Sequence, residues 1–116
     1  MSYDEHVLAH MKWKARLKNH LNGHEHIDNG TLAKDNLCEL GKWIYGDGQR
    51  HAKVRAFEDL KARHTKFHLV AASVASNAMS YSPDKVKELL DPMKSEFGRA
   101  TSDVINALSN AKSLLE

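Results

Sequence analysis

The side chains best suited to chemistry in this chain are its single cysteine and some of its eight histidines. His64 and His68 lie four residues apart, so a helix would hold both imidazoles on one face, with Cβ atoms about 6 Å apart. His10 lies on the apolar face of an expected first helix, and Cys38 lies in an expected second helix. We therefore interpret His10, Cys38, His64 and His68 as the ligands of one metal ion.

One thiolate and three imidazoles match the tetrahedral coordination of zinc, which takes sulfur at about 2.3 Å and nitrogen at about 2.0 to 2.1 Å. Copper and nickel accept the same donors, so spacing alone does not identify the metal. The alternative is a chain without metal. In that case the histidines bond to carbonyl or carboxylate groups, and Cys38 packs as a small apolar side chain.

Two other sets of histidines compete with this interpretation. His6 lies one turn before His10 on the same helical face, but nearer the helix end. His20, His24 and His26 lie in or beside a polar loop and could bind a metal loosely, although loop histidines are more often solvated.

The first two expected helices position His10 and Cys38. The first runs from Ser2 to about Leu21, and its apolar face is formed by Tyr3, His10, Trp13, Leu17 and Leu21. The second has Thr31 as its N-cap, Cys38 in its middle and Gly-Asp-Gly at 46–48 after its last residue, Tyr45. A glycine within it, Gly41, indicates that another backbone or ring approaches closely.

The third helix is expected from about Lys53 to Met79, with His64 at the centre of an apolar stripe. The members of this stripe are Phe57, Leu60, His64, Phe67, Ala71, Ala75 and Ala78. The fourth helix has Ser82 as N-cap and Pro83 at its first position. Its apolar seam consists of Val86, Leu90, Met93, Phe97, Ala100, Val104, Leu108, Ala111 and Leu115, and Pro92 should bend or divide it near 90–91.

Four amphipathic helical segments joined mainly by short polar loops predict an all-α fold. We expect one domain over residues 1–116, an antiparallel four-helix bundle with a short second helix and a kinked C-terminal helix. The sequence leaves open whether the fourth-helix seam closes within one chain or between two.

Composition excludes several classes of protein. Seventeen basic and fifteen acidic residues are interspersed, giving a net charge of +2 and no basic footprint for nucleic acid. No apolar run reaches the roughly 20 residues of a membrane span, and the N-terminus is not signal-like. One cysteine cannot form an internal disulfide, so we expect a reducing, cytoplasmic location and no membrane insertion.

The motifs argue against an enzyme. Four protein ligands close a zinc site, whereas a catalytic zinc keeps a position for water. Thr65 follows His64, where a helical metalloprotease would have glutamate. The chain also lacks a Gly-rich phosphate loop and a nucleophile motif.

Three motifs, His10-x-x-Trp13, Cys38-x-Leu40-Gly41-x-Trp43 and His64-x-x-x-His68, resemble in content and order the chemoreceptor zinc-binding domain, a bacterial module of this size. The match spans about residues 3–75. The resemblance implies that His10, Cys38, His64 and His68 bind zinc, whereas His6 does not stand at the motif position. It also implies a helical, typically homodimeric domain of the bacterial cytoplasm that regulates chemoreceptors or diguanylate cyclases, and that responds to zinc and to oxidants such as hypochlorous acid.

Two further functions compete with a zinc or redox sensor. The first is a structural zinc module that serves dimerisation or docking without sensing, and the second is a helical adaptor that binds no metal. Neither a receptor signalling hairpin nor a cyclase domain is present in these 116 residues, so we expect a free-standing family member or an excised module.

Overall fold

The computed structural model describes residues 3–23, 26–36, 38–76, 82–91 and 93–115. Within these ranges the chain is helical and has no strand. The elements are α1 (Tyr3–Leu21), α2 (Asn29–Leu32), α3 (Glu39–Tyr45), the 3₁₀ helix η1 (Asp47–His51), α4 (Arg55–Ala75), α5 (Pro83–Leu89) and α6 (Glu96–Leu115). No helix in the described ranges is both long and apolar enough to cross a membrane.

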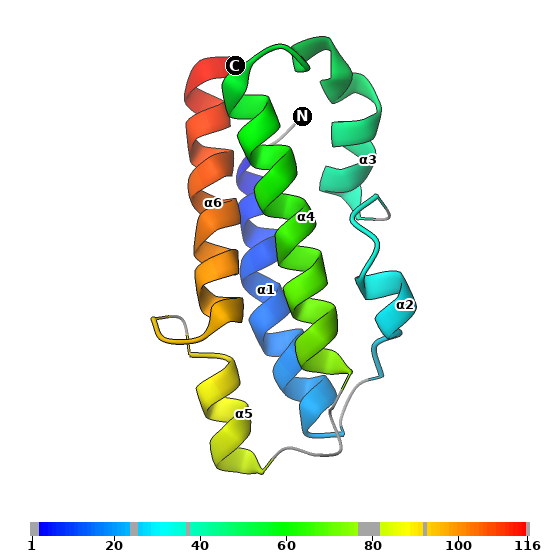
Figure 1. The fold of residues 1–116 in the computed structure, drawn as a ribbon, viewed down its shortest axis with the longest axis vertical. Coiled ribbons are helices and arrows are strands. Elements are labelled where there is room, and N and C mark those ends of the chain that lie inside the picture. Colours follow the sequence, from blue (N-terminus) through cyan, green and yellow to red (C-terminus); the bar gives the residue numbers. More distant parts are fainter. Residues whose placement is uncertain (1–2, 24–25, 37, 77–81, 92, 116) are drawn as a thin grey trace.

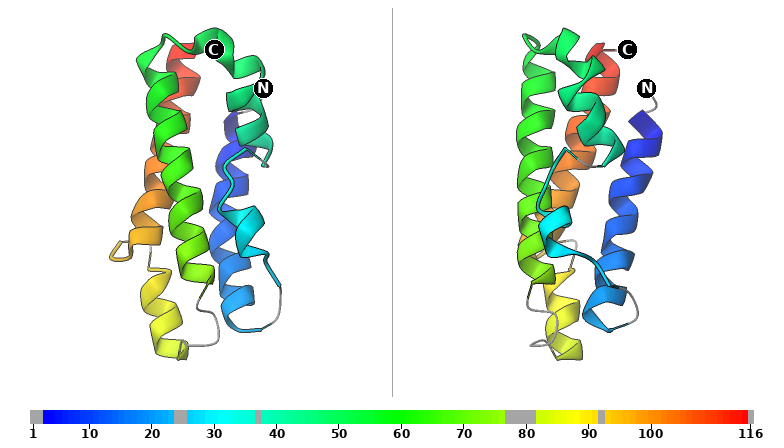
Figure 2. Two further views of the ribbon diagram at one scale, coloured as in Figure 1. Left: turned by 45° about the vertical axis from the view of Figure 1, so that its right-hand side comes forward. Right: turned by 90° about the vertical axis from the view of Figure 1, so that its right-hand side faces the viewer.

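The helices form four antiparallel arms, which confirms the predicted bundle. Figure 1 shows α1 running down the molecule, α2 and α3 returning upward, α4 running down, and α5 and α6 returning. The two further views in Figure 2 show the same order, so that α1 and α4 run in the same direction and α6 runs against both. α4 contacts α1, α2 and α6, so its side chains can meet side chains from every other arm.

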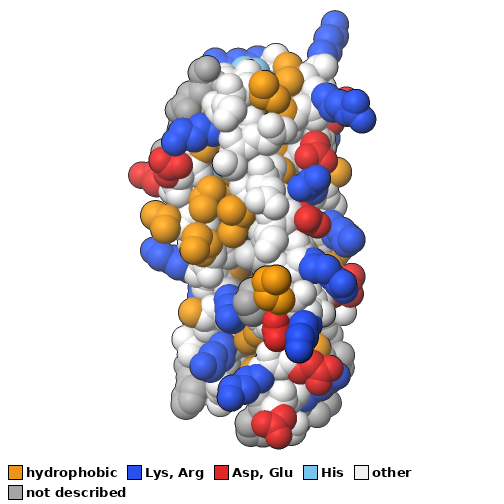
Figure 3. Space-filling model, turned by 90° about the vertical axis from the view of Figure 1, so that its left-hand side faces the viewer, with side chains coloured by type: hydrophobic (Ala, Val, Ile, Leu, Met, Phe, Trp, Pro, Cys, Tyr) orange, Lys and Arg blue, Asp and Glu red, His pale blue; other side chains and the backbone are white. Residues whose placement is uncertain are grey.

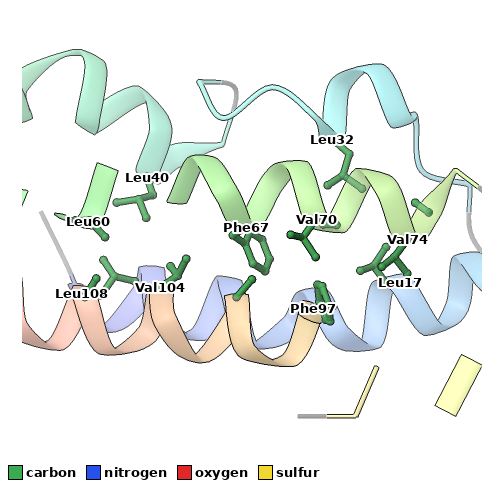
Figure 4. Close-up of a cluster of buried hydrophobic side chains, with 14 of the residues drawn as sticks. Leu17, Leu32, Leu40, Leu60, Phe67, Val70, Val74, Phe97, Val104 and Leu108 are labelled. Carbon is green, nitrogen blue, oxygen red and sulfur yellow. The ribbon is translucent and has the colours of Figure 1, made fainter. Parts of the chain in front are cut away.

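Three long helices, α1, α4 and α6, surround the apolar core (Figure 4). The face predicted for α1 is confirmed, since Tyr3, Leu17 and Leu21 are buried and Trp13 is partly buried against the core. Most of the fourth-helix seam is also buried within the single chain, namely Val86, Leu90, Phe97, Ala100, Val104, Leu108 and Ala111. This seam therefore closes inside the chain.

The last predicted helix is divided, as its proline indicated. Ser82 caps α5 by accepting a hydrogen bond from the Lys85 amide, and α6 begins only at Glu96. In the turn between them, the Asp91 Oδ1 accepts hydrogen bonds from the amides of Met93 and Lys94. The prediction that Met93 is a core residue is wrong, because this turn leaves its side chain 82% exposed. Pro92 lies outside the described residues.

The expected continuous second helix is wrong. The chain forms the short helix α2, then a turn, and then α3, whose N-cap is Cys38 in an extended conformation. Thr31 does not cap α2; the Asp28 carboxylate instead accepts a hydrogen bond from the Gly30 amide. Gly41 permits the break and confirms the predicted close approach, because a Cβ there would lie 1.8 Å from the carbonyl oxygen of Asp35. The turn therefore folds back onto the first turn of α3, which excludes one straight helix.

The third predicted helix is confirmed with later and shorter bounds. It begins at Arg55 rather than near Lys53, and its described part ends at Ala75. Its apolar stripe is buried as predicted at Phe57, Leu60, His64, Phe67, Ala71 and Ala75. Ala78 and Met79 lie outside the described residues.

Candidate metal centre

Three arms of the bundle bring the four predicted metal-binding residues together. His10 comes from α1, Cys38 precedes α3, and His64 and His68 lie one turn apart on α4. One potential ligand atom from each of the four residues lies within 4.8 Å of all the others. The histidines are 2%, 0% and 2% exposed, and Cys38 is partly buried. The arrangement is compact enough to surround one ion.

The distances within this cluster fit a tetrahedral zinc ion. The Cys38 Sγ lies 3.2 Å from the His64 Nε2 and 3.6 Å from the His68 Nε2. The two Nε2 atoms lie 3.1 Å apart. Tetrahedral bonds of the usual zinc lengths separate two nitrogens by about 3.3 Å, and a sulfur from a nitrogen by about 3.5 Å. Three of the four donors therefore have spacings suited to this ion.

Backbone carbonyl groups orient two of the imidazoles. The His10 Nδ1 lies 2.8 Å from the His6 carbonyl oxygen, and the His68 Nδ1 lies 2.9 Å from the Leu32 carbonyl oxygen. Because a carbonyl oxygen only accepts, each Nδ1 must carry the proton, and each Nε2 presents a lone pair. This is the tautomer in which metal-binding histidines are usually held.

Two buried nitrogen atoms lack a hydrogen-bond partner among the described residues, the His10 Nε2 and the His64 Nδ1. An unsatisfied polar atom in an apolar interior costs about 1–3 kcal/mol. The His10 Nε2 is also the atom that its carbonyl partner leaves free as a lone-pair donor. A cation within the cluster would satisfy this atom, so the residues present fit a zinc ion.

Burial keeps the imidazoles neutral. It lowers the pKa of His10 to about 4, although the hydrogen bond to the His6 carbonyl opposes the shift. Burial, and then the neighbouring His68 and His10, lower the pKa of His64 to about 3. Burial also lowers the pKa of His68. At neutral pH all three rings therefore keep a lone pair available for a metal.

The thiol behaves differently from the imidazoles. Burial raises the pKa of Cys38 above its ordinary value, and the backbone amides of Gly41 and Leu40 oppose this shift only in part. Because its pKa is raised, Cys38 is a protonated thiol at neutral pH in the metal-free chain. The thiolate is the form that metals bind. Metal binding must release this proton.

Asp35 fastens the turn that presents Cys38. Its carboxylate accepts a hydrogen bond of 2.7 Å from the Tyr45 hydroxyl in α3, and another from the Thr65 hydroxyl in α4. Burial would raise the pKa of Asp35, but the hydrogen bonds from Thr65 and Tyr45 lower it overall. The sequence analysis did not identify Asp35; the signal that could have done so is the adjacent pair Asp35-Asn36, because both residue types favour turns.

The competing histidines are not part of this cluster. His6 supplies its carbonyl oxygen to His10, and its side chain is not in the four-residue group. The His20 ring connects two segments of the backbone, because its Nδ1 accepts a hydrogen bond from the Ile27 amide and its Nε2 donates one to the Ala75 carbonyl oxygen. His26 is exposed, and His24 lies outside the described residues.

Comparisons with known proteins point to the same group of residues. No match was found among curated proteins or among solved structures. The sequence profile named chemoreceptor zinc-binding domain matches residues 10–75, a span that holds all four members of the cluster. This family is regulatory and non-catalytic, occurs in signalling proteins such as chemoreceptors, and has zinc as its cofactor. The chain belongs to the chemoreceptor zinc-binding domain family.

Proposed function

We propose that this chain is a zinc-binding sensor domain of bacterial signalling, with His10, Cys38, His64 and His68 as the zinc ligands. One observation carries the proposal: four potential ligand atoms from three arms lie within 4.8 Å of one another in the bundle interior. Four protein ligands leave no position for a catalytic water, so regulation rather than catalysis is the expected role.

The cluster would couple zinc occupancy to the packing of the arms. When bound, zinc holds the Cys38 sulfur as a thiolate and acts as a common partner for three imidazoles. Because α1 and the turn before α3 each supply one ligand and α4 supplies two, loss of His10 or Cys38 removes the link of a whole arm. The free energy of metal binding is then also free energy of packing. An output domain of a chemoreceptor or diguanylate cyclase would respond to this change.

Cys38 is the residue that would respond to oxidants. It is the only soft, oxidisable donor in the cluster, and it is partly exposed whereas the three histidines are buried. Hypochlorous acid would oxidise the thiolate to sulfenic acid and would itself be reduced to chloride, with its oxygen transferred to sulfur. The oxidised sulfur is a weaker ligand, so the same site would serve both signals.

A structural zinc module is the second candidate. The deep burial of His10, His64 and His68 favours it, because structural zinc sites are closed. In that case zinc would stabilise the bundle without reporting its own concentration. Comparison of the metal-free and zinc-bound forms distinguishes the two candidates, because a sensor must change the packing of its arms or its binding to a partner when zinc is lost, whereas in a structural module both stay the same.

The proposed ligands are tested by competition of zinc against a chelator. Cys38→Ser and His10→Gln should each weaken zinc binding by about 100-fold or more, since loss of an outer hydrogen-bond partner alone costs about 10- to 100-fold. His6→Gln is the matched control and should leave the affinity unchanged, because His10 uses only the His6 carbonyl. Unchanged affinity in Cys38→Ser, or equal losses in His6→Gln and His10→Gln, would refute the ligand assignment.

We also propose that the domain forms a homodimer through the outer face of α6. Four exposed residues on this face are uncharged, Ser102, Asn106, Ser109 and Ser113. Figure 3 shows the side of the molecule on which α6 lies, where a column of backbone and of side chains that are neither charged nor hydrophobic is bordered by a hydrophobic group. Depletion of charge is typical of interface cores.

Sedimentation of charged variants tests this interface. Ser109→Arg should convert the dimer into a monomer, whereas Leu69→Arg, at an exposed position on α4, should not. A monomeric parent chain at micromolar concentration, or dissociation by Leu69→Arg alone, would contradict the proposal.

A further inference from the structure

Two hydrogen bonds fix the carboxylate of Asp35 beside the metal cluster. Its Oδ2 atom accepts a hydrogen bond of 2.7 Å from the Tyr45 hydroxyl in α3, and another from the Thr65 hydroxyl in α4. Thr65 directly follows His64 in the chain, and Asp35 precedes Cys38 by three residues. The carboxylate therefore has a defined position next to the segments that supply two of the proposed ligands.

The negative charge of Asp35 acts on three members of the cluster. Burial would raise the pKa of Asp35, but its hydrogen bonds lower it overall, so the group is ionised at neutral pH. Burial has the largest influence on the pKa of His64, His68 and Cys38, lowering the first two and raising the third, and the charge of Asp35 raises all three. An ion bound between these residues would therefore also interact with the Asp35 charge.

The proposed ligand set gives different total charges with different metals. Three neutral imidazoles and one thiolate around a divalent zinc ion carry one positive charge in total. Copper(I) is monovalent and also accepts thiolate ligands, and with it the same set is neutral. A net charge in a partly buried site is costly unless an opposite charge lies near it. A neighbouring carboxylate therefore favours the zinc complex over the copper(I) complex.

We propose that Asp35 makes this site selective for divalent over monovalent metal ions, through its charge and without binding the metal. The inference rests on the proposed function in taking the four clustered residues as the ligands. Because Coulomb energy is proportional to charge, loss of the carboxylate costs a divalent ion about twice the interaction energy that it costs a monovalent ion. Other charges of the chain add to this interaction pair by pair, so they do not remove the difference.

Asp35→Asn tests the proposal, because it removes the charge and can keep the contacts. Both hydroxyls donate to the same oxygen atom, so an asparagine carbonyl oxygen in that position can accept both hydrogen bonds. Affinities for zinc and for copper(I) are measured without oxygen, by competition with a chelator of each ion. We expect the zinc-to-copper(I) affinity ratio to fall about fivefold. The Cys38 thiol loses its proton to either ion, so this step cancels from the ratio.

Three further variants locate the effect. Glu39→Gln is the matched control, because it removes the same charge next to Cys38 from a side chain that is 83% exposed; water screens this charge, so the ratio should stay unchanged. Tyr45→Phe keeps the Asp35 charge but removes a hydrogen bond, so it should weaken the binding of both ions alike. Tyr45→Lys, at an exposed position, places a cation beside the carboxylate and should lower the ratio even if Asp35→Asn does not fold.

Cobalt(II) separates an effect of charge from one of shape, because it is divalent like zinc. The zinc-to-cobalt(II) ratio should be the same in Asp35→Asn and in the parent chain. An unchanged zinc-to-copper(I) ratio in Asp35→Asn, or an equal fall in Glu39→Gln or Tyr45→Phe, would overturn the proposal. So would a zinc-to-cobalt(II) ratio that falls by as much. A parent chain that binds no zinc would refute the zinc assignment, whereas an unchanged ratio in a chain that binds zinc would refute only the role of Asp35.

Discussion

Two regions of the bundle that share α4 are stabilised in different ways. Toward α6, α4 packs apolar side chains such as Phe67, whose ring lies 5.7 Å from that of Phe97. Toward α1 and the Cys38 turn it presents His64 and His68, in a cluster where the buried Nε2 of His10 lacks a partner among the described residues. The apolar contacts stabilise the fold without a bound ligand, whereas a buried nitrogen atom of the cluster is satisfied only when a cation is bound. The apolar region therefore provides the stability of the fold, and the cluster is the region whose stability depends on zinc.

The largest effect should come from the apolar region. Phe97 is 1% exposed, and Phe97→Ala should lower the free energy of unfolding by about 3–5 kcal/mol through lost burial and a new cavity. Met93→Ala, in the turn before α6, should change it by less than about 0.5 kcal/mol, because that side chain is 82% exposed. Urea unfolding of the zinc-loaded protein measures both. Similar losses in the two variants would contradict the division between core and turn.

Zinc removal should have the next largest effect, and a local one. With free zinc at 100 times its dissociation constant, binding stabilises the folded chain by about 2.7 kcal/mol, which a chelator removes. Hydrogen exchange should then increase most around Leu32 to Gly41 and least in the centre of α6, near Val104. None of the four clustered residues comes from α6, whose buried residues pack through apolar contacts, which is why we expect this contrast. Equal loss of protection in both places would show that the two regions are one cooperative unit.

Gly41→Ala sharpens the comparison within the metal region. The added Cβ would lie 1.8 Å from the Asp35 carbonyl oxygen, so the turn before Cys38 must move. Overpacking of this kind costs about 1–3 kcal/mol, and we expect weaker zinc binding together with the loss of stability. Gly30→Ala is the control, because its added Cβ would meet the Asp28 carboxylate only at 3.4 Å. Chelator competition on both variants makes the measurement, and parental affinity in Gly41→Ala would argue against a fixed turn.

Most of the fold and the three histidines of the cluster could be predicted from the sequence because both follow helical periodicity. His64 and His68 are four residues apart on one amphipathic helix, and His10 lies on the apolar face of another. The turn that presents Cys38 could not be predicted in this way. It depends on Asp35, whose partner Thr65 is 30 residues away in sequence. A contact of that range leaves no periodic pattern.

Met93 shows a second way in which helical periodicity fails, because here it predicts a buried side chain that is in fact exposed. Its spacing continues the apolar seam of the fourth helix, but the chain leaves the helix after Leu89 and resumes it at Glu96. Periodicity assumes an unbroken helix, so it assigns a buried face to a residue that lies in a turn. The proline next to it predicted the break but not which side chains the break would expose.

The smallest predicted effect is the response of the metal-free protein to mild acid. Burial lowers the pKa of His10 to about 4 and of His64 to about 3, and it also lowers that of His68, whereas an unfolded histidine titrates near 6.5. As the pH falls, the unfolded chain binds protons first, so the contribution of these histidines to the free energy of unfolding begins to decline about one pH unit above their unfolded pKa and declines further below it. Between about pH 7.5 and about pH 6.5 the three histidines together should account for a loss of about 1 kcal/mol.

Urea unfolding in the presence of a chelator measures this loss. His64→Gln should reduce the dependence on pH, because one of the three groups no longer titrates, whereas the exposed His26→Gln should not. Stability that stays constant or rises over this range would mean that the metal-free cluster takes up protons as readily as the unfolded chain. The interior would then be open to water without zinc, and the contrast between the two sides of α4 would hold only for the zinc-bound protein.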